Sequence, residues 1–133
     1  MPAMKKGYKA LLEEANAEIE AVTPAEAADL AKSDDVLLVD IRDVRELQRE
    51  GKIPGAIHAP RGMLEFWVDP ESPYHKEVFS SGKTFIFFCA GGLRSALATK
   101  TVQDMGLAPV KHIEGGFGAW REAGLPIEAV PAK

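Results

Sequence analysis

The chain has 133 residues, of which 46% are hydrophobic and 27% are charged, and its formal net charge is −4 at pH 7. This size and composition are typical of one soluble globular domain, and the acidic balance argues against nucleic acid or an anionic membrane as a partner. Because Cys89 is the single cysteine, neither an intramolecular disulfide nor a cysteine-based metal cage is possible.

No targeting or membrane segment is evident. A secretory signal needs an uninterrupted apolar stretch of about 7–15 residues, and none occurs near the N-terminus. The longest apolar run lies around Phe85–Cys89, far below the ~20 residues that span a bilayer. We therefore expect a cytoplasmic protein.

The N-terminal part of the chain predicts two helices. Apolar residues at helical spacing within residues 5–20 indicate an amphipathic helix. Thr23, Pro24 and Glu26 combine an N-cap, a first-turn proline and a glutamate three positions after the cap. This capping box predicts a second helix that ends near Ala31.

Two continuous apolar runs, Val36–Ile41 and Thr84–Phe88, are typical of strands buried on both faces, which occur in parallel sheets covered by helices. Helices and short strands alternate with them, so we expect an α/β architecture with a central parallel sheet. The remaining expected elements are a helix from Asp43 to near Gly51, a short strand at 53–58, an irregular segment at 61–83, a helix over 95–105, a strand over 110–113 and a helix over 117–123.

The most informative feature is Cys89, which ends a buried strand and is followed by a glycine-containing loop and a helix. Ligands bind at this edge of open parallel sheets. Gly91 and Gly92 tolerate the positive φ angles that a sharp turn requires. Backbone N–H groups of such a loop, together with the helix N-terminus, favour a thiolate or persulfide anion. The expected binding residues are Ala90, Gly91, Gly92, Leu93, Arg94, which holds an anionic substrate, and Ser95, which caps the helix or donates its hydroxyl to the loop.

A second interpretation of Cys89 is a small buried hydrophobic residue, and composition alone favours it. The surrounding pattern reverses this preference, because a buried strand precedes the cysteine, a helix follows it, and Arg94 stands at the end of the loop.

Three motifs in the right order resemble the rhodanese family and cover most of residues 23–128. The loop Cys89–Ser95 resembles the active-site loop of that family. An upstream signature comprises Leu38–Arg42, Glu46 and 51–60, and a closing signature comprises Glu114–Trp120 with 124–126.

The resemblance implies a three-layer α/β/α fold with a five-stranded parallel sheet in a domain over residues 23–133, preceded by a helical extension over residues 1–22. It implies a thiosulfate sulfurtransferase in which Cys89 accepts a sulfane sulfur, forms a persulfide and passes the sulfur to a thiophilic acceptor such as cyanide, a thiol or a protein sulfur carrier. It implies neither a cofactor nor a metal, and the protein is expected to be a monomer or a homodimer.

Two other functions remain open. Related phosphatases place five residues between the cysteine and the arginine, whereas four separate Cys89 from Arg94 here; we therefore expect sulfur transfer rather than phosphatase or arsenate reductase activity. A disulfide-type arsenate reductase also often needs a resolving cysteine, which this chain lacks. The other alternative is a non-catalytic binding or sulfur-relay module.

The remaining polar candidates are interpreted as structural. Asp40 and Arg42 are expected to form a hydrogen-bonded pair that braces neighbouring loops, with Glu46 closing the set. His58 is expected to be structural rather than a general base, and His75 and His112 have no metal-ligand spacing.

Phe66 and Trp67, in the irregular segment, are candidates for a pocket over Cys89 or for an interface, because aromatic side chains are favoured in both. A loop packed on the sheet with its own apolar cluster is the equal alternative. Phe117 and Trp120 are expected in the core.

Overall fold

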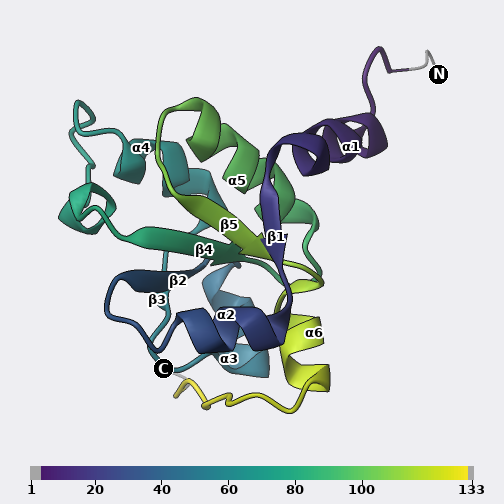
Figure 1. The fold of residues 1–133 in the computed structure, drawn as a ribbon, viewed down its shortest axis with the longest axis vertical. Coiled ribbons are helices and arrows are strands. Elements are labelled where there is room, and N and C mark those ends of the chain that lie inside the picture. Colours follow the sequence, from purple (N-terminus) through teal and green to yellow (C-terminus); the bar gives the residue numbers. More distant parts are fainter. Residues whose placement is uncertain (1–3, 132–133) are drawn as a thin grey trace.

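The computed structural model describes residues 4–131 and is a three-layer α/β/α domain around a five-stranded, wholly parallel sheet in the order β1-β5-β4-β2-β3 (Figure 1). The strands are β1 (Glu20–Val22), β2 (Val36–Asp40), β3 (Ile57–His58), β4 (Thr84–Phe88) and β5 (Val110–Ile113). The helices are α1 (Tyr8–Glu18), α2 (Pro24–Leu30), α3 (Val44–Glu50), α4 (Leu64–Val68), α5 (Leu93–Asp104) and α6 (Gly116–Glu122), with short 3-10 helices η1 (Arg61–Met63) and η2 (Glu77–Ser80). None of these helices is long and apolar enough to cross a bilayer.

Strand β4 lies at the centre of the sheet and divides its side chains between two apolar clusters. Successive residues of a strand point to opposite faces. Phe85 and Phe87 therefore pack under α4 and α5, whereas Ile86 and Phe88 pack against α2 and α6. The two layers of helices are visible on opposite sides of the sheet in Figure 1. Burial on both faces explains why this strand is apolar from Phe85 to Phe88.

The predicted starts of α2 and α3 are confirmed by their caps, whereas α5 begins at Leu93 after Gly92, so Ser95 does not cap it. Thr23 Oγ1 accepts a hydrogen bond from the Glu26 amide, and the Glu26 carboxylate accepts one from the Thr23 amide. Asp43 and Glu46 form the same reciprocal arrangement at the start of α3. These side chains satisfy amide groups that have no acceptor within the first turn of a helix.

Strand β1 was not expected from the sequence. Glu20–Val22 pairs with β5 and forms one edge of the sheet, although it lies within the range assigned to the N-terminal extension. Only Val22 of its three residues is buried, so the segment shows no strand-like alternation. Helix α1 packs beside α5, where the Gln103 side chain donates to the Glu18 carbonyl (Figure 1). The division of the chain at residue 22 stays a prediction.

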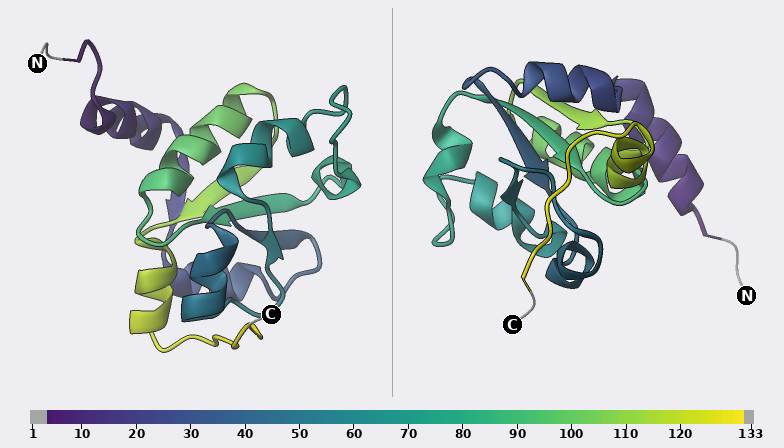
Figure 2. Two further views of the ribbon diagram at one scale, coloured as in Figure 1. Left: turned by 180° about the vertical axis from the view of Figure 1, so that it is seen from behind. Right: turned by 90° about the horizontal axis from the view of Figure 1, so that it is seen from below.

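The segment over residues 61–83 packs on the sheet. Leu64, Val68 and Phe79 are buried in the cluster under α4 and α5, and Trp67 packs against the same cluster. The 3-10 helix η2 lies near the end of this segment. Beyond α6, the chain returns across the molecule to an isolated bridge between Lys52 and Glu128 (Figure 2).

Arg42 connects three parts of the domain from a fully buried position. Its guanidinium forms an ion pair with Asp40 at 2.8 Å, and its Nη2 donates to the Gly51 carbonyl at 2.9 Å. Its Cζ atom lies 4.0 Å from the centroid of the Phe117 ring. Strand β2, the end of α3 and helix α6 are therefore held together by one side chain.

Replacing Arg42 with leucine should lower the free energy of unfolding by about 3–5 kcal/mol, because it leaves the buried Asp40 carboxylate without a counter-charge. Denaturant unfolding measures this loss. Arg45→Leu, which removes an exposed ion pair with Asp43, is the matched control and should change stability little. Equal stability of the two variants would contradict the bracing role of Arg42.

Candidate active site

Cys89 occupies the first position after the central strand β4, at the carboxyl edge of the sheet. Its side chain is 1% exposed. The loop from Ala90 to Gly92 leads directly into α5, so the sulfur lies at the N-terminal end of a twelve-residue helix. The partial positive charge of such a helix end stabilises an anion placed there.

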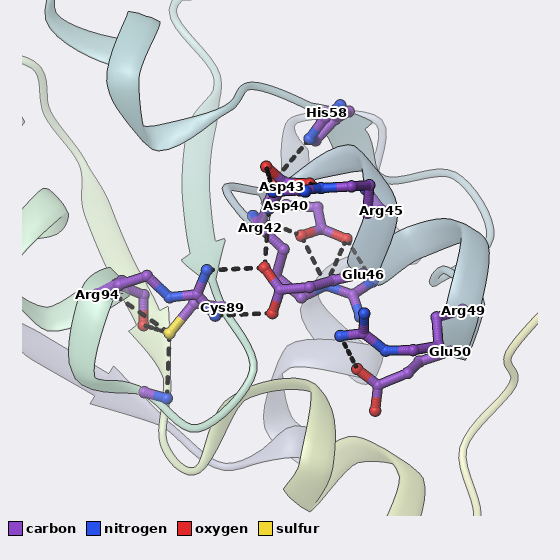
Figure 3. A network of polar contacts seen from close by, with 12 residues as sticks. Asp40, Arg42, Asp43, Arg45, Glu46, Arg49, Glu50, His58, Cys89 and Arg94 are labelled. Carbon is purple, nitrogen blue, oxygen red and sulfur yellow. Dashed lines mark hydrogen bonds and ion pairs between the residues drawn. The ribbon is translucent and has the colours of Figure 1, made fainter.

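Two backbone amides point at the sulfur (Figure 3). The Gly92 nitrogen lies 3.2 Å and the Ser95 nitrogen 3.3 Å from Cys89 Sγ. The first amides of a helix have no acceptor within the helix. Leu93 and Arg94, the first two residues of α5, are in this position. Of the predicted loop amides, that of Gly92 contacts the sulfur and the Ser95 amide joins it; a role of the loop in binding a substrate stays a prediction.

The two loop glycines have different roles. Gly92 has a φ angle of +98°, and a Cβ atom there would lie 3.3 Å from the Gly115 nitrogen. Gly91 has no positive φ angle, and a Cβ atom there would meet nothing within 4 Å. The expectation that both glycines supply positive φ angles is thus wrong for Gly91, because the chain makes its sharp turn at the residue immediately before α5.

Helix α6 fixes the loop from behind. The Phe117 amide donates to the Cys89 carbonyl at 2.8 Å, and the Gly118 amide donates to the Ala90 carbonyl at 3.0 Å. A Cβ atom on Gly116 would lie 2.4 Å from the Cys89 carbonyl oxygen. Gly116 of the closing motif is therefore required by a close approach between two backbones.

Arg94 forms a two-point ion pair with Glu46 of α3, with distances of 2.8 and 2.9 Å (Figure 3). The Arg94 hydrogen bond lowers the pKa of Glu46 from 4.5 to about 2. The same bond raises the pKa of Arg94, and the nearby Cys89 makes a smaller contribution in the same direction. Glu46 was expected to join Asp40 and Arg42; the side chain that it binds is instead that of the loop arginine, which it holds beside Cys89.

Ser95 and His112 extend the polar contacts behind the sulfur. Ser95 Oγ lies 3.6 Å from Cys89 Sγ and 3.0 Å from His112 Nδ1. Burial lowers the pKa of His112. Sequence reasoning missed His112, because it considered this histidine only as a metal ligand. The alternation of β5, in which His112 and Val110 share a face, was the available signal.

The other predicted residues lie outside these contacts. Asp40 and Arg42 form the buried pair described above, and His58 Nε2 contacts the Arg42 carbonyl at 2.6 Å. Phe66 is exposed, whereas Trp67 packs on the core with the Lys76 ammonium 5.0 Å from its ring centroid. A pocket or interface role for Phe66 and Trp67 stays a prediction.

The residues that the structure describes hold no metal-binding cluster at Cys89. Within residues 4–131, no group of three or more His, Cys, Asp or Glu side chains could hold a metal ion. An apolar groove lies between α2 and α6 and is lined by residues such as Ala28, Trp120 and Leu125. Cys89 and its loop do not line this groove.

The sequence model of the rhodanese-like domain family matches residues 23–123 of this chain. The chain belongs to the rhodanese-like domain family. This family includes a sulfurtransferase from Allochromatium vinosum that is 35% identical over 100 residues, which are 75% of this chain and 85% of that protein. The match to the family model thus covers most of the chain and includes the Cys89 loop.

Two solved structures share this rhodanese fold. A Rhodopseudomonas palustris protein of unknown function, described as a possible tyrosine phosphatase, is 63% identical with a TM-score of 0.92, over 96% of this chain and 99% of that chain. The polysulfide-sulfur transferase homodimer of Wolinella succinogenes is 32% identical with a TM-score of 0.71, over 92% and 88% of the two chains.

Gly92→Ala should destabilise this rhodanese-like domain by about 1–2 kcal/mol and slow alkylation of Cys89, because the loop must leave its left-handed conformation. Gly91→Ala is the matched control and should stay within about 0.5 kcal/mol of the wild type. Denaturant unfolding and thiol alkylation measure both effects. Similar losses in the two variants would show that the loop geometry is wrong.

The ion pair between Glu46 and Arg94 should make stability fall in acid. The folded-state pKa of Glu46 is lowered from 4.5 to about 2, so its contribution is complete above pH 4.5 and is lost as the pH falls toward 2. Because the Arg94 side chain is 42% exposed, we expect a contribution of only about 1 kcal/mol.

Glu46→Gln should therefore be less stable than the wild type at neutral pH, and the difference should vanish toward pH 2, as measured by denaturant unfolding at successive pH values. Arg94→Gln should lose the same acid dependence. If the difference in unfolding free energy between Glu46→Gln and the wild type were the same at all pH values, packing rather than charge would account for the loss of stability.

Proposed function

We propose that this rhodanese-like domain is a sulfurtransferase that moves a sulfane sulfur to a thiophilic acceptor through a persulfide on Cys89. The observation that carries the proposal is the position of Cys89 Sγ, which accepts hydrogen bonds from the Gly92 and Ser95 amides at the N-terminus of α5. A sulfur atom held in this way is stabilised as an anion, and a thiolate is the nucleophile in displacement at sulfur.

The reaction has two displacement steps. The Cys89 thiolate attacks the sulfane sulfur of the donor, a sulfur–sulfur bond forms, and the donor's bond to that sulfur breaks with its electron pair leaving on the departing group. The acceptor then attacks the terminal sulfur, and Cys89 leaves as a thiolate. Negative charge is on sulfur before and after each step, so the fixed amides and helix end can stabilise it throughout.

The donor and acceptor are proposed from residue chemistry and from the names of relatives. Arg94 retains positive charge beside the loop and is suited to hold an anionic donor such as thiosulfate, although Glu46 offsets part of that charge. The Wolinella relative is named a polysulfide-sulfur transferase, which makes an inorganic polysulfide a second donor to test. Cyanide, a thiol or a protein sulfur carrier would accept the sulfur. The cytoplasmic location and the monomeric or homodimeric state stay predictions.

Phosphatase activity is the second candidate, because the Rhodopseudomonas relative is described as a possible tyrosine phosphatase. Four residues separate Cys89 from Arg94 here, and a shorter loop suits a single sulfur atom better than a tetrahedral phosphate. This loop length supports sulfur transfer.

A non-catalytic binding or sulfur-relay module is the remaining alternative, since it would share the same loop. Turnover distinguishes the two. An enzyme cycles repeatedly between small donors and acceptors, whereas a relay accepts one sulfur and retains it until a protein partner arrives.

Intact-protein mass spectrometry tests the persulfide. Treatment with thiosulfate or polysulfide should add the mass of one sulfur atom to the wild type, because Cys89 is the single cysteine. Cyanide should remove it, because cyanide attacks the terminal sulfur. Cys89→Ser is the matched control and should gain no mass.

An equal gain in the Cys89→Ser variant, or no gain with either donor, would contradict the proposal. Hydrolysis of an aryl phosphate by the wild type but not by the variant would then favour the phosphatase. Absence of both reactions would favour the binding module.

A further inference from the structure

Three buried side chains form a line of contacts that begins at the reactive sulfur. Ser95 Oγ lies 3.6 Å from Cys89 Sγ, and His112 Nδ1 lies 3.0 Å from Ser95 Oγ. The exposed fractions of Cys89, Ser95 and His112 are 1%, 0% and 5%. They come from the end of β4, the first turn of α5 and strand β5, so the fold rather than local sequence brings them together.

The Ser95 hydroxyl has one proton and can donate it to only one of its two neighbours. If His112 Nδ1 carries a proton, it donates to Ser95 Oγ, and the hydroxyl proton is directed at the sulfur. If Nδ1 is bare, the hydroxyl donates to Nδ1, and Oγ can only accept a proton from a Cys89 thiol. A thiolate accepts and cannot donate, so it selects the first arrangement.

We propose that His112 is a positioning residue for Cys89, which acts through Nδ1 to hold the Ser95 hydroxyl as a third hydrogen-bond donor to the sulfur anion. The first two donors are the Gly92 and Ser95 amides. His112 does not touch the sulfur, and its whole effect passes through Ser95. The proposal rests on the proposed function in taking the Cys89 thiolate as the reactive species.

The protons balance along this line. Ionisation of Cys89 releases one proton to solvent. The Ser95 hydroxyl turns from His112 Nδ1 to the sulfur, and the neutral imidazole exchanges a proton at Nε2 for one at Nδ1. The imidazole has one proton before and after, so no base stronger than solvent is needed.

The surroundings of His112 favour the neutral imidazole that this exchange requires. Its register neighbours are Ala21 on β1 and Phe87 on β4, and neither side chain titrates. Helix α5 contributes the Ser95 hydroxyl, and Cys89 lies beyond it. Glu114 raises the pKa of His112, but burial lowers it by more.

The experiment measures the rate of Cys89 alkylation by iodoacetamide as a function of pH in four single variants and one double variant. Ser95→Ala and His112→Leu should each slow alkylation at pH 7 by about tenfold, because each removes a donor to the anion. His112→Asn should recover most of the rate, since its amide places an N–H near the position of Nδ1.

Two comparisons distinguish a positioning role of His112 from an effect of lost packing. The double variant of Ser95→Ala and His112→Leu should alkylate no more slowly than Ser95→Ala alone, because His112 acts through the hydroxyl. Thr99→Val is the matched control on the same helix, since Thr99 Oγ1 is buried without a hydrogen-bond partner in the described structure. It should keep the wild-type profile.

A wild-type alkylation profile in His112→Leu would overturn the proposal, as would independent effects that multiply in the double variant. If His112→Leu does not fold, as judged by denaturant unfolding, Ser95→Ala and His112→Asn still test the proposal. A wild-type alkylation profile in Ser95→Ala would show that the hydroxyl is not a donor to the sulfur anion. Alkylation does not require sulfur transfer. A shifted profile without persulfide formation would therefore reject the proposed function and leave the role of His112 intact.

Discussion

The site depends on one constraint, which is that the Cys89 sulfur lies at the start of α5 with backbone amides directed at it. That arrangement requires the chain to turn within three residues after leaving β4, and Gly92 makes the turn in a left-handed conformation. Every other feature of the site holds this turn in place or modifies the charge around it.

The loop is held from two sides by different kinds of interaction. Behind it, amides of α6 bind the Cys89 and Ala90 carbonyls, and Gly116 permits the two backbones to approach. In front of it, Glu46 of α3 holds Arg94 by charge. The backbone bonds fix position, whereas the ion pair adjusts how much positive charge a substrate meets. Under the proposed function, a loop supported in this way is pre-organised for an anion and needs little rearrangement when charge moves between sulfur atoms.

Buried polar groups connect the site to the rest of the fold. Arg42 ties β2, α3 and α6 together beneath the loop, and α3 and α6 are the two helices that brace it. Ser95 and His112 make a second connection to β5. Charged and polar groups are costly to bury without partners. In this domain such groups are buried around Cys89, where the proposed chemistry needs a defined geometry.

The sequence by itself determined the features that depend on local pattern. The buried strands over 36–40 and 84–88 were predicted from continuous apolar runs, and the starts of α2 and α3 from capping residues that act over three positions. Cys89 and its loop were located because strand, glycine and helix signals are adjacent in the chain. The tertiary structure decided what depends on residues far apart. It paired Glu46 with Arg94, made β1 an edge strand through pairing with β5, and placed His112 behind Ser95. It also placed the positive φ angle of the loop at Gly92 rather than Gly91, since this angle follows from how β4, α5 and α6 meet. These contacts join residues 17 to 91 positions apart, and no local propensity specifies a partner at such a distance.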